Sequence, residues 1–378
     1  MLPIRFAYLV LVLFFFLCGP SWAVSFDVTN LVTDDQSAHA AQITDPGLVN
    51  AWGISFGPSS PFWVSANGSG TSTIYAVNPT TQVTAKQGLT VSIPGNGSVT
   101  GQVFNSNPAA FNGDNFLFVS EDGTVSGWRG ALGTTAETLA TASSAKVYKG
   151  SAFATISGNS SLYAANFRAA TIDVFKGTAA APALAGSFTD PNLPAGYAPF
   201  NVQNLNGTLY VTFAVQDATK HDEVAGAGQG IVDSFDLQGN LLGRVATSGK
   251  LNAPWGIAIA PSSFGAMAGD LLVGNFGDGR ITAFDASTHT VVGQILGADG
   301  QPLSIDGLWA LSAGNDGSGG SSHLLYFSAG PDEESHGLFG VLTPVPEPSS
   351  YVLLIAGLGM VGLWRQRRYM LSRARRET

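Results

Sequence analysis

Two short charged segments stand out in this chain of 378 residues, of which only 11% are charged. Residues 220–223 read Lys-His-Asp-Glu, and residues 332–336 read Asp-Glu-Glu-Ser-His. Carboxylate oxygens are ligands that Ca²⁺ prefers, and they also line polar pockets for sugars or lactones. The segments lie in two expected loops, residues 216–229 and 330–336, that are longer than a tight turn requires. We therefore take the following residues of these segments as candidates for a binding site: Asp222, Glu223, Asp332, Glu333, Glu334 and His336.

A repeated unit of three apolar runs organises the rest of the chain. In residues 251–285 a run at 255–260 ends at Pro261, a second occupies 270–275, and a Gly-Asp-Gly turn leads into 281–285. Short runs rich in β-branched and aromatic residues, bounded by Gly, Pro, Asn and Asp, predict antiparallel strands. The chain contains six copies of the unit, with an aromatic residue near positions 52, 111, 153, 200, 255 and 309.

This repeat predicts an all-β protein, a β-propeller of six four-stranded blades, because a period of roughly 40–55 residues without helices is typical of propeller blades. A β-sandwich of irregular hairpins is the alternative. Residues 26–32 alternate like a strand, and in a ring of blades the first strand often completes the last blade. The propeller domain is expected over residues 24–344, because no charge block or change in composition divides it.

A four-stranded blade places two connections on one face: the one before its inner strand and the one between its second and third strands. Polar residues expected before inner strands are Asn50, Asn107, Asn201, Asn252 and Asp306. Those expected in the second connections, besides the two charged segments, are Asn67, Glu121, Asp122, Asn166, Asn275 and Asp278. Asn and Asp are also favoured in tight turns without any ligand, because they tolerate left-handed backbone and hydrogen-bond it locally. Ligand binding and turn formation both stay open at these positions.

The two ends of the chain predict export. Residues 1–23 have Arg5, an apolar centre and a small residue, Ala23, at the end, as in a cleaved secretory signal peptide. An uncleaved anchor helix is the alternative. At the other end, Val345-Pro346-Glu347-Pro348 precedes an apolar segment at 351–364 and a run of arginines. The apolar segment is marginal in length for a transmembrane helix, and the arginines should stay cytoplasmic.

This tail resembles the PEP-CTERM sorting signal of Gram-negative bacteria. The resemblance implies recognition by an exosortase-type enzyme, transient membrane anchoring and delivery to the cell envelope, cell surface or extracellular space; an ordinary C-terminal anchor is the alternative. The upstream repeats resemble an uncharacterised propeller family found with such tails and, more distantly, NHL-type six-bladed propellers. The resemblance to these propeller families assigns no catalytic residue to this chain.

Charge narrows the choice of partner. Without leader and tail, the chain keeps 10 Lys and Arg against 24 Asp and Glu, a net charge near −14. An acidic domain repels nucleic-acid phosphates, so no nucleic-acid partner is expected. The single cysteine, Cys18, lies in the leader, which leaves the propeller without a disulfide framework.

We therefore expect an exported binding or scaffold protein whose polar face recognises a partner, for which exopolysaccharide is a candidate. No catalytic residue is assigned, no metal is identified, and no cofactor is expected beyond Ca²⁺ as a candidate. The alternative from another class is a Ca²⁺-assisted lactonase or esterase, since some six-bladed propellers hold a metal at the axis. It requires several oxygen ligands converging on one point, together with a base. A matrix unit without a discrete ligand is the third interpretation.

Overall fold

The computed structural model describes residues 24–345, 357–361 and 363–365. Residues 25–343 form one compact unit, and the second unit comprises the two ends of the chain. The expected signal peptide, most of the expected transmembrane segment and the residues Pro346, Glu347 and Pro348 lie outside the described residues. Residues 357–361 and 363–365 are helical. In the part of the chain that is described, no helix is long and apolar enough to cross a membrane.

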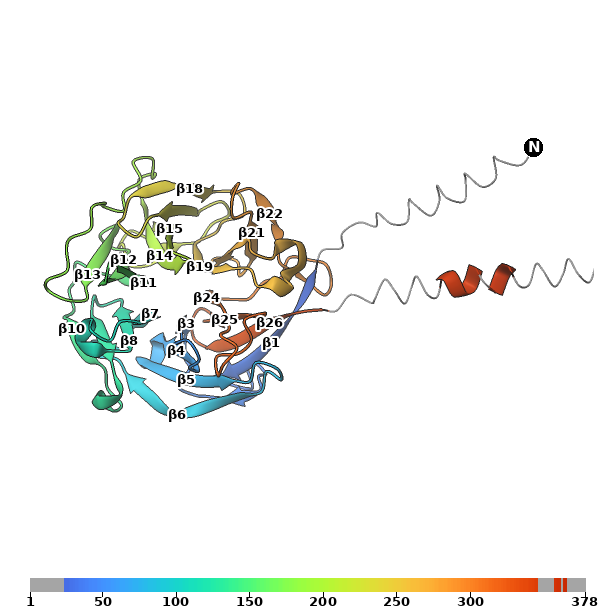
Figure 1. The fold of residues 1–378 in the computed structure, drawn as a ribbon, viewed down its shortest axis with the longest axis horizontal. Helices are drawn as coiled ribbons and strands as arrows, with labels where there is room; N and C mark the ends of the chain where they lie inside the picture. The colour runs from blue at the N-terminus through green and yellow to red at the C-terminus, as the bar shows by residue number, and fades with distance from the viewer. Residues whose placement is uncertain (1–23, 346–356, 362, 366–378) are drawn as a thin grey trace, which may run out of the picture. The chain divides into compact units, whose positions relative to one another are not determined.

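Six sheets form the blades of a propeller within residues 25–344, as predicted (Figure 1). We number the blades in chain order and give their strands from the axis to the rim. Blade 1 contains β3 (Ala51–Ser55), β4 (Phe62–Ala66), β5 (Thr71–Val77) and β6 (Thr84–Ser92). Blade 2 contains β7 (Val99–Phe104), β8 (Phe116–Ser120), β9 (Val125–Trp128) and β10 (Glu137–Ala140). Blade 3 contains β11 (Tyr148–Ile156), β12 (Asn159–Asn166) and β13 (Thr171–Lys176).

The second half of the ring follows the same plan. Blade 4 contains β14 (Tyr197–Leu205), β15 (Thr208–Gln216), β17 (Ile231–Phe235) and β18 (Leu241–Thr247). Blade 5 contains β19 (Pro254–Ile259), β20 (Leu271–Asn275), β21 (Ile281–Phe284) and β22 (Val291–Gln294). Blade 6 contains β24 (Leu308–Ala313), β25 (Leu325–Ala329), β26 (Leu338–Pro344) and β1 (Ser25–Thr33). The short elements are β2 (Ile43–Thr44), β16 (Glu223–Val224), β23 (Leu296–Gly297), η1 (Asn67–Ser69), η2 (Phe111–Gly113), η3 (Gly130–Leu132) and η4 (Ser262–Met267).

The first strand closes the ring, because β1 pairs with β26 as the outer strand of blade 6. β1 also pairs in parallel with β2 and with β23, the latter between blades 5 and 6. In Figure 1 the blue strand β1 and the red strand β26 lie side by side at the rim. Closure removes the exposed edge that an open ring would leave at β26.

Inner strands are buried on both faces, whereas outer strands such as β18 and β22 expose part of their side chains. The inner strands approach one another closely at glycines. A side chain at Gly101 would meet the backbone N of Ser151, and one at Gly256 would meet the carbonyl of Trp309. As a result, the axial channel is narrow where these strands meet, with a free volume of about 10 Å³ at that level.

The repeat was misread in blade 2. An aromatic residue near position 111 was expected to mark the inner strand, but Phe111 lies in η2, between β7 and β8. The inner strand is β7, which reads Val-Thr-Gly-Gln-Val-Phe. It lacks the tryptophan or phenylalanine that marks β3, β14, β19 and β24 near their starts, so its pattern resembled a loop.

Candidate functional site

The connections predicted to share a face do come together, and we call this side of the ring the loop face. Its floor consists of aromatic side chains at the axis. The Trp52 and Trp309 rings stack with centroids 3.8 Å apart, and Phe276 stacks on the other side of Trp309 at 4.1 Å. Trp255 meets Trp309 edge-on at 5.9 Å. The tryptophans are therefore packing residues, and they support the polar side chains above them.

Above this floor lies an axial cluster of charged and amide side chains from blades 1, 2, 3, 4 and 6. We define it by the following residues: Asn50, Asn67, Glu121, Lys149, Asp222, Glu223 and Glu334. Asn50 and Asn67 come from blade 1, Glu121 from the turn after β8, and Asp222 and Glu223 from the connection between β15 and β17. Glu334 comes from the loop between β25 and β26.

Lys149, in β11, is the centre of this cluster, and only 1% of its side chain is exposed. Its Nζ donates to Glu121 Oε1 at 2.6 Å and to Asp222 Oδ1 at 3.1 Å. The ammonium also lies 5.3 Å from the centre of the Trp52 ring, within the range of a cation–π contact. Burial by itself would lower the pKa of Lys149, but the surrounding carboxylates, Glu121 foremost, outweigh it and raise the pKa.

The acidic residues of the cluster differ in their environments. Glu334 Oε2 accepts a hydrogen bond from Asn50 Nδ2 at 2.5 Å, and Glu121 Oε2 accepts one from Asn67 Nδ2 at 3.1 Å. Burial raises the pKa of Glu223 to about 7 and also raises that of Glu334. With one ammonium among four carboxylates, Glu223 and Glu334 are the groups that hold a proton most readily.

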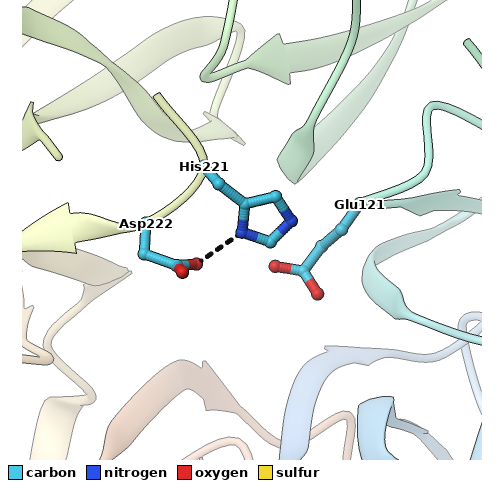
Figure 2. A group of neighbouring side chains, drawn as sticks. All are labelled: Glu121, His221 and Asp222. Atoms are coloured by element: carbon cyan, nitrogen blue, oxygen red, sulfur yellow. Dashed lines mark hydrogen bonds and ion pairs between the residues drawn. The ribbon is translucent and has the colours of Figure 1, made fainter. Parts of the chain in front are cut away.

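Figure 2 shows the edge of the cluster, where Glu121, His221 and Asp222 face one another. His221 Nδ1 lies 2.8 Å from Asp222 Oδ1, and one ligand atom of each residue lies within 4.8 Å of the others. These are residue types that bind divalent cations. However, the Lys149 ammonium already contacts both carboxylates. A divalent ion would be placed beside this buried positive charge, so the group does not fit a metal while Lys149 is present.

A cleft of about 570 Å³ opens on the loop face beside the axial cluster. Five connections of blades 2, 3 and 4 form its wall. Its lining residues are Asn96, Ser98, Glu121, Asp122, Ala142, Ser143, Ser144, Lys146, Val147, Arg168 and His221. Nearly all of them are polar or charged, so the cleft suits a hydrated, hydroxyl-rich ligand better than an apolar one.

Three of the predicted acidic and histidine residues lie together away from this cleft, where the loop after β1 meets the loop between β25 and β26. Asp306 Oδ2 accepts the backbone N–H of Asp332, whose own carboxylate lies 2.9 Å from His39 Nε2. His336 Nδ1 lies 3.0 Å from Asp34 Oδ2, a hydrogen bond that raises the pKa of His336. These contacts join the first and last parts of the ring.

The neighbouring residue Glu333 is exposed, and its backbone is unusual. Asp332, Glu333 and Glu334 all have positive φ, at 55°, 55° and 65°. Three consecutive non-glycine residues in this region are strained, which costs free energy in the folded state. The strained turn places Glu334 in the axial cluster while Asp332 remains at the ring closure.

The remaining predicted asparagines serve the backbone. Asn166 Oδ1 accepts the backbone N–H of Val147 at 3.3 Å and that of Ala169 at 3.2 Å. Asn275 Oδ1 likewise accepts the backbone N–H of Asn252 at 3.1 Å, and its Nδ2 donates to Lys250 O at 2.8 Å. At these two positions the local interpretation of the pattern accounts for the contacts.

Two positions expected before inner strands were wrong. Asn201 lies inside β14, where its Nδ2 donates to Trp255 O at 2.8 Å and its side chain lines the axial channel. Asn107 follows β7 instead of preceding it, because the inner strand of blade 2 begins earlier than expected. Neither residue joins the axial cluster.

Comparison with known proteins gives the family. The chain is 31% identical over 342 residues to uncharacterized protein R648 of Acanthamoeba polyphaga mimivirus, covering 85% of this chain and 80% of that protein. Uncharacterized protein L690 of the same virus is 30% identical over 346 residues, covering 86% of this chain and 87% of that protein. The chain belongs to the family of these two proteins.

This member of the R648 family also carries a sorting signal. Residues 344–368 match the PEP-CTERM protein-sorting motif, which implies processing by an exosortase and export to the cell envelope or surface. Among solved structures, the α-L-arabinofuranosidase Arb93A of Fusarium graminearum superposes with a TM-score of 0.54 at 11% identity, over 84% of this chain and 98% of that protein. At that identity the likeness shows only the propeller fold.

For this R648-family protein, sequence reasoning missed Lys149 and Arg168. A signal for Lys149 was present, because it is a lone charge in a segment that otherwise reads as a strand, Tyr148–Ile156.

Residues 53–57, Gly-Ile-Ser-Phe-Gly, also match the spacing of a hydrolase nucleophile elbow. Ser55 nevertheless ends strand β3 and is followed by a loop and strand β4 instead of a helix, so the match carries no chemistry.

Proposed function

We propose that this exported propeller is a non-catalytic binding protein, and that the cleft on its loop face holds a segment of a polysaccharide at the cell surface. The cleft is the observation that carries the proposal. Its volume of about 570 Å³ lies within the usual range for ligand sites, and its wall consists mostly of hydroxyl, amide and charged side chains from several blades, with Ala142 and Val147 between them. Sugar hydroxyl groups both donate and accept hydrogen bonds, so they suit such a wall.

The rival function, a Ca²⁺-assisted lactonase or esterase, is supported less well. Such an enzyme needs carboxylate oxygens free to bind an ion at the axis. Here Glu121 and Asp222 both bind the buried Lys149 ammonium. The chain itself therefore supplies the positive charge that compensates these two carboxylates.

The test measures binding of purified full-length protein to a panel of bacterial exopolysaccharides by affinity electrophoresis. The size of each polymer is also measured after incubation with the protein. Retarded migration without shortening of the polymer is expected. Ala142→Trp places an indole in the cleft without removing any hydrogen bond and should abolish the retardation. Ala286→Trp, in the connection between β21 and β22, is the matched control and should leave it unchanged.

Two outcomes would contradict the proposal. Shortening of the polymer or release of small sugars would favour a hydrolase. Failure of every polysaccharide to retard the protein would favour a structural unit of the matrix that has no discrete ligand.

A further inference from the structure

The two carboxylates that line the cleft already accept hydrogen bonds from the chain. Glu121 receives Lys149 Nζ on Oε1 and Asn67 Nδ2 on Oε2. Asp122 receives the backbone N–H of Thr124 on Oδ1 and that of Asn96 on Oδ2, both at 2.8 Å. The two carboxylates that line the cleft therefore have a donor on every oxygen, and they are poorly placed to accept hydrogen bonds from a ligand.

The donors of Arg168 are not used up. Its Nη1 donates to Ser144 O at 2.9 Å. Among the described residues its Nη2 makes no hydrogen bond, and no carboxylate lies within ion-pair distance of the guanidinium. Its Nε also lacks a partner but is buried, out of reach of a ligand in the cleft. The other cation of the cleft, Lys146, lies 3.5 Å from Asp173 Oδ2 and over the rings of Tyr148 and Phe175. Arg168 is thus the cation with spare capacity.

The backbone around Arg168 is fixed. The preceding residue, Phe167, is fully buried, and its N–H donates to Val147 O at 2.8 Å. Gln216 Nε2 lies 3.3 Å from the carbonyl of Arg168 itself. The turn is therefore held on both sides, and the Nη1 bond to Ser144 O restricts the guanidinium before any ligand arrives, which lowers the entropy cost of binding.

We propose that the cleft selects acidic saccharides and that Arg168 binds their carboxylate. This inference rests on the proposed function and names the class of ligand. A guanidinium matches a carboxylate with two parallel charge-assisted hydrogen bonds, which a neutral hydroxyl does not supply. Since the whole domain carries a net negative charge, selection of an anionic sugar must come from this local contact and not from long-range attraction.

The experiment compares an oligogalacturonate with its methyl ester of equal length, by titration calorimetry on purified full-length protein. The two probes share a backbone and differ in charge. The acid should bind about tenfold more tightly than the ester, and added salt should reduce the difference. Arg168→Gln should remove this preference by weakening binding of the acid more than binding of the ester, and Arg168→Lys should retain part of it.

The matched control is Arg280→Gln, an exposed arginine in the corresponding turn of blade 5, which should keep the full preference. Equal binding of acid and ester, or a preference that survives in Arg168→Gln, would overturn the inference and leave the binding function standing. Failure of both oligosaccharides while a neutral polysaccharide binds would overturn it as well. If no saccharide of any kind binds, the proposed function itself fails.

Discussion

Lys149 connects three blades through a single ammonium, because it lies in β11 and bonds Glu121 of blade 2 and Asp222 of blade 4. Removing one partner of a buried ion pair leaves the other charges without compensation. Lys149→Met is therefore expected to reduce the free energy of unfolding by about 3–5 kcal/mol at neutral pH. Urea denaturation measures the loss.

The matched control is Lys250→Met, which removes an exposed lysine and should change the stability by less than about 0.5 kcal/mol. The effect of Lys149→Met should shrink at acid pH, because protonated carboxyl groups no longer need the ammonium. Equal losses in the two variants would show that Lys149 contributes nothing specific.

Glu223 predicts a pH dependence. Its pKa is about 7 in the folded protein, above the ordinary value of 4.5. The folded state therefore holds the proton more tightly than the unfolded state, so this stabilisation is present below pH 4.5 and is lost as the pH rises through 7. Glu223→Gln should stabilise the protein at pH 8 by on the order of 2 kcal/mol and have little effect at pH 4. Thermal melting at the two pH values checks the sign.

The sequence predicted part of the site. Asn50, Asn67, Asp222 and Glu223 were placed on a common face by topology alone, and the structure brings them into one cluster. Arg168 was not found, because a single arginine carries no spacing pattern, and the signal for Lys149, a lone charge in a strand-like segment, was overlooked. Asn201 was misplaced because the strand around it begins before Phe200 and not after it.

At the scale of elements, strands rich in aromatic residues were predicted well. The inner strands with Trp52, Trp255 and Trp309 follow the repeat, whereas β7 lacks such a marker and was missed. Sequence alone also could not show that blade 3 has three strands. The segment after β13 instead packs Phe188 against Tyr163 and Phe235, between blades 3 and 4.

Closure by β1 gives a prediction at this scale. Phe26 is 1% exposed, and its ring centroid lies 4.4 Å from that of Phe264 in η4. Phe26→Ala should lower the free energy of unfolding by about 3–5 kcal/mol, because it leaves a cavity where β1 meets blade 5. Val28→Ala, in the same strand but 41% exposed, should cost less than about 0.5 kcal/mol. A similar loss in both variants, measured in urea, would mean that strand pairing and not packing holds β1.

At the scale of the whole molecule, the sorting motif should act separately from the propeller. Replacing Pro346, Glu347 and Pro348 with alanine should leave the melting temperature unchanged, since these residues follow the compact unit. The same replacement should strongly reduce processing of the C-terminal tail by the exosortase, so that the chain keeps its tail in the membrane fraction. Alanine at Ser349 and Ser350 is the control. Normal processing of the triple variant, seen by mass spectrometry of cell fractions, would contradict the assignment.

The pairing of β1 with β26 also sets the order in which the protein matures. β1 begins at Ser25 and is among the first parts of the propeller to be synthesised, yet its partner ends at Pro344. Blades 1 to 5 can form as they emerge, because each is built from consecutive strands. The ring closes only through a contact between distant parts of the chain, which is intrinsically slow. The sorting motif at residues 344–368 begins at the last residue of β26, so the strand needed for ring closure is synthesised just before the signal that directs the protein to the cell envelope or surface.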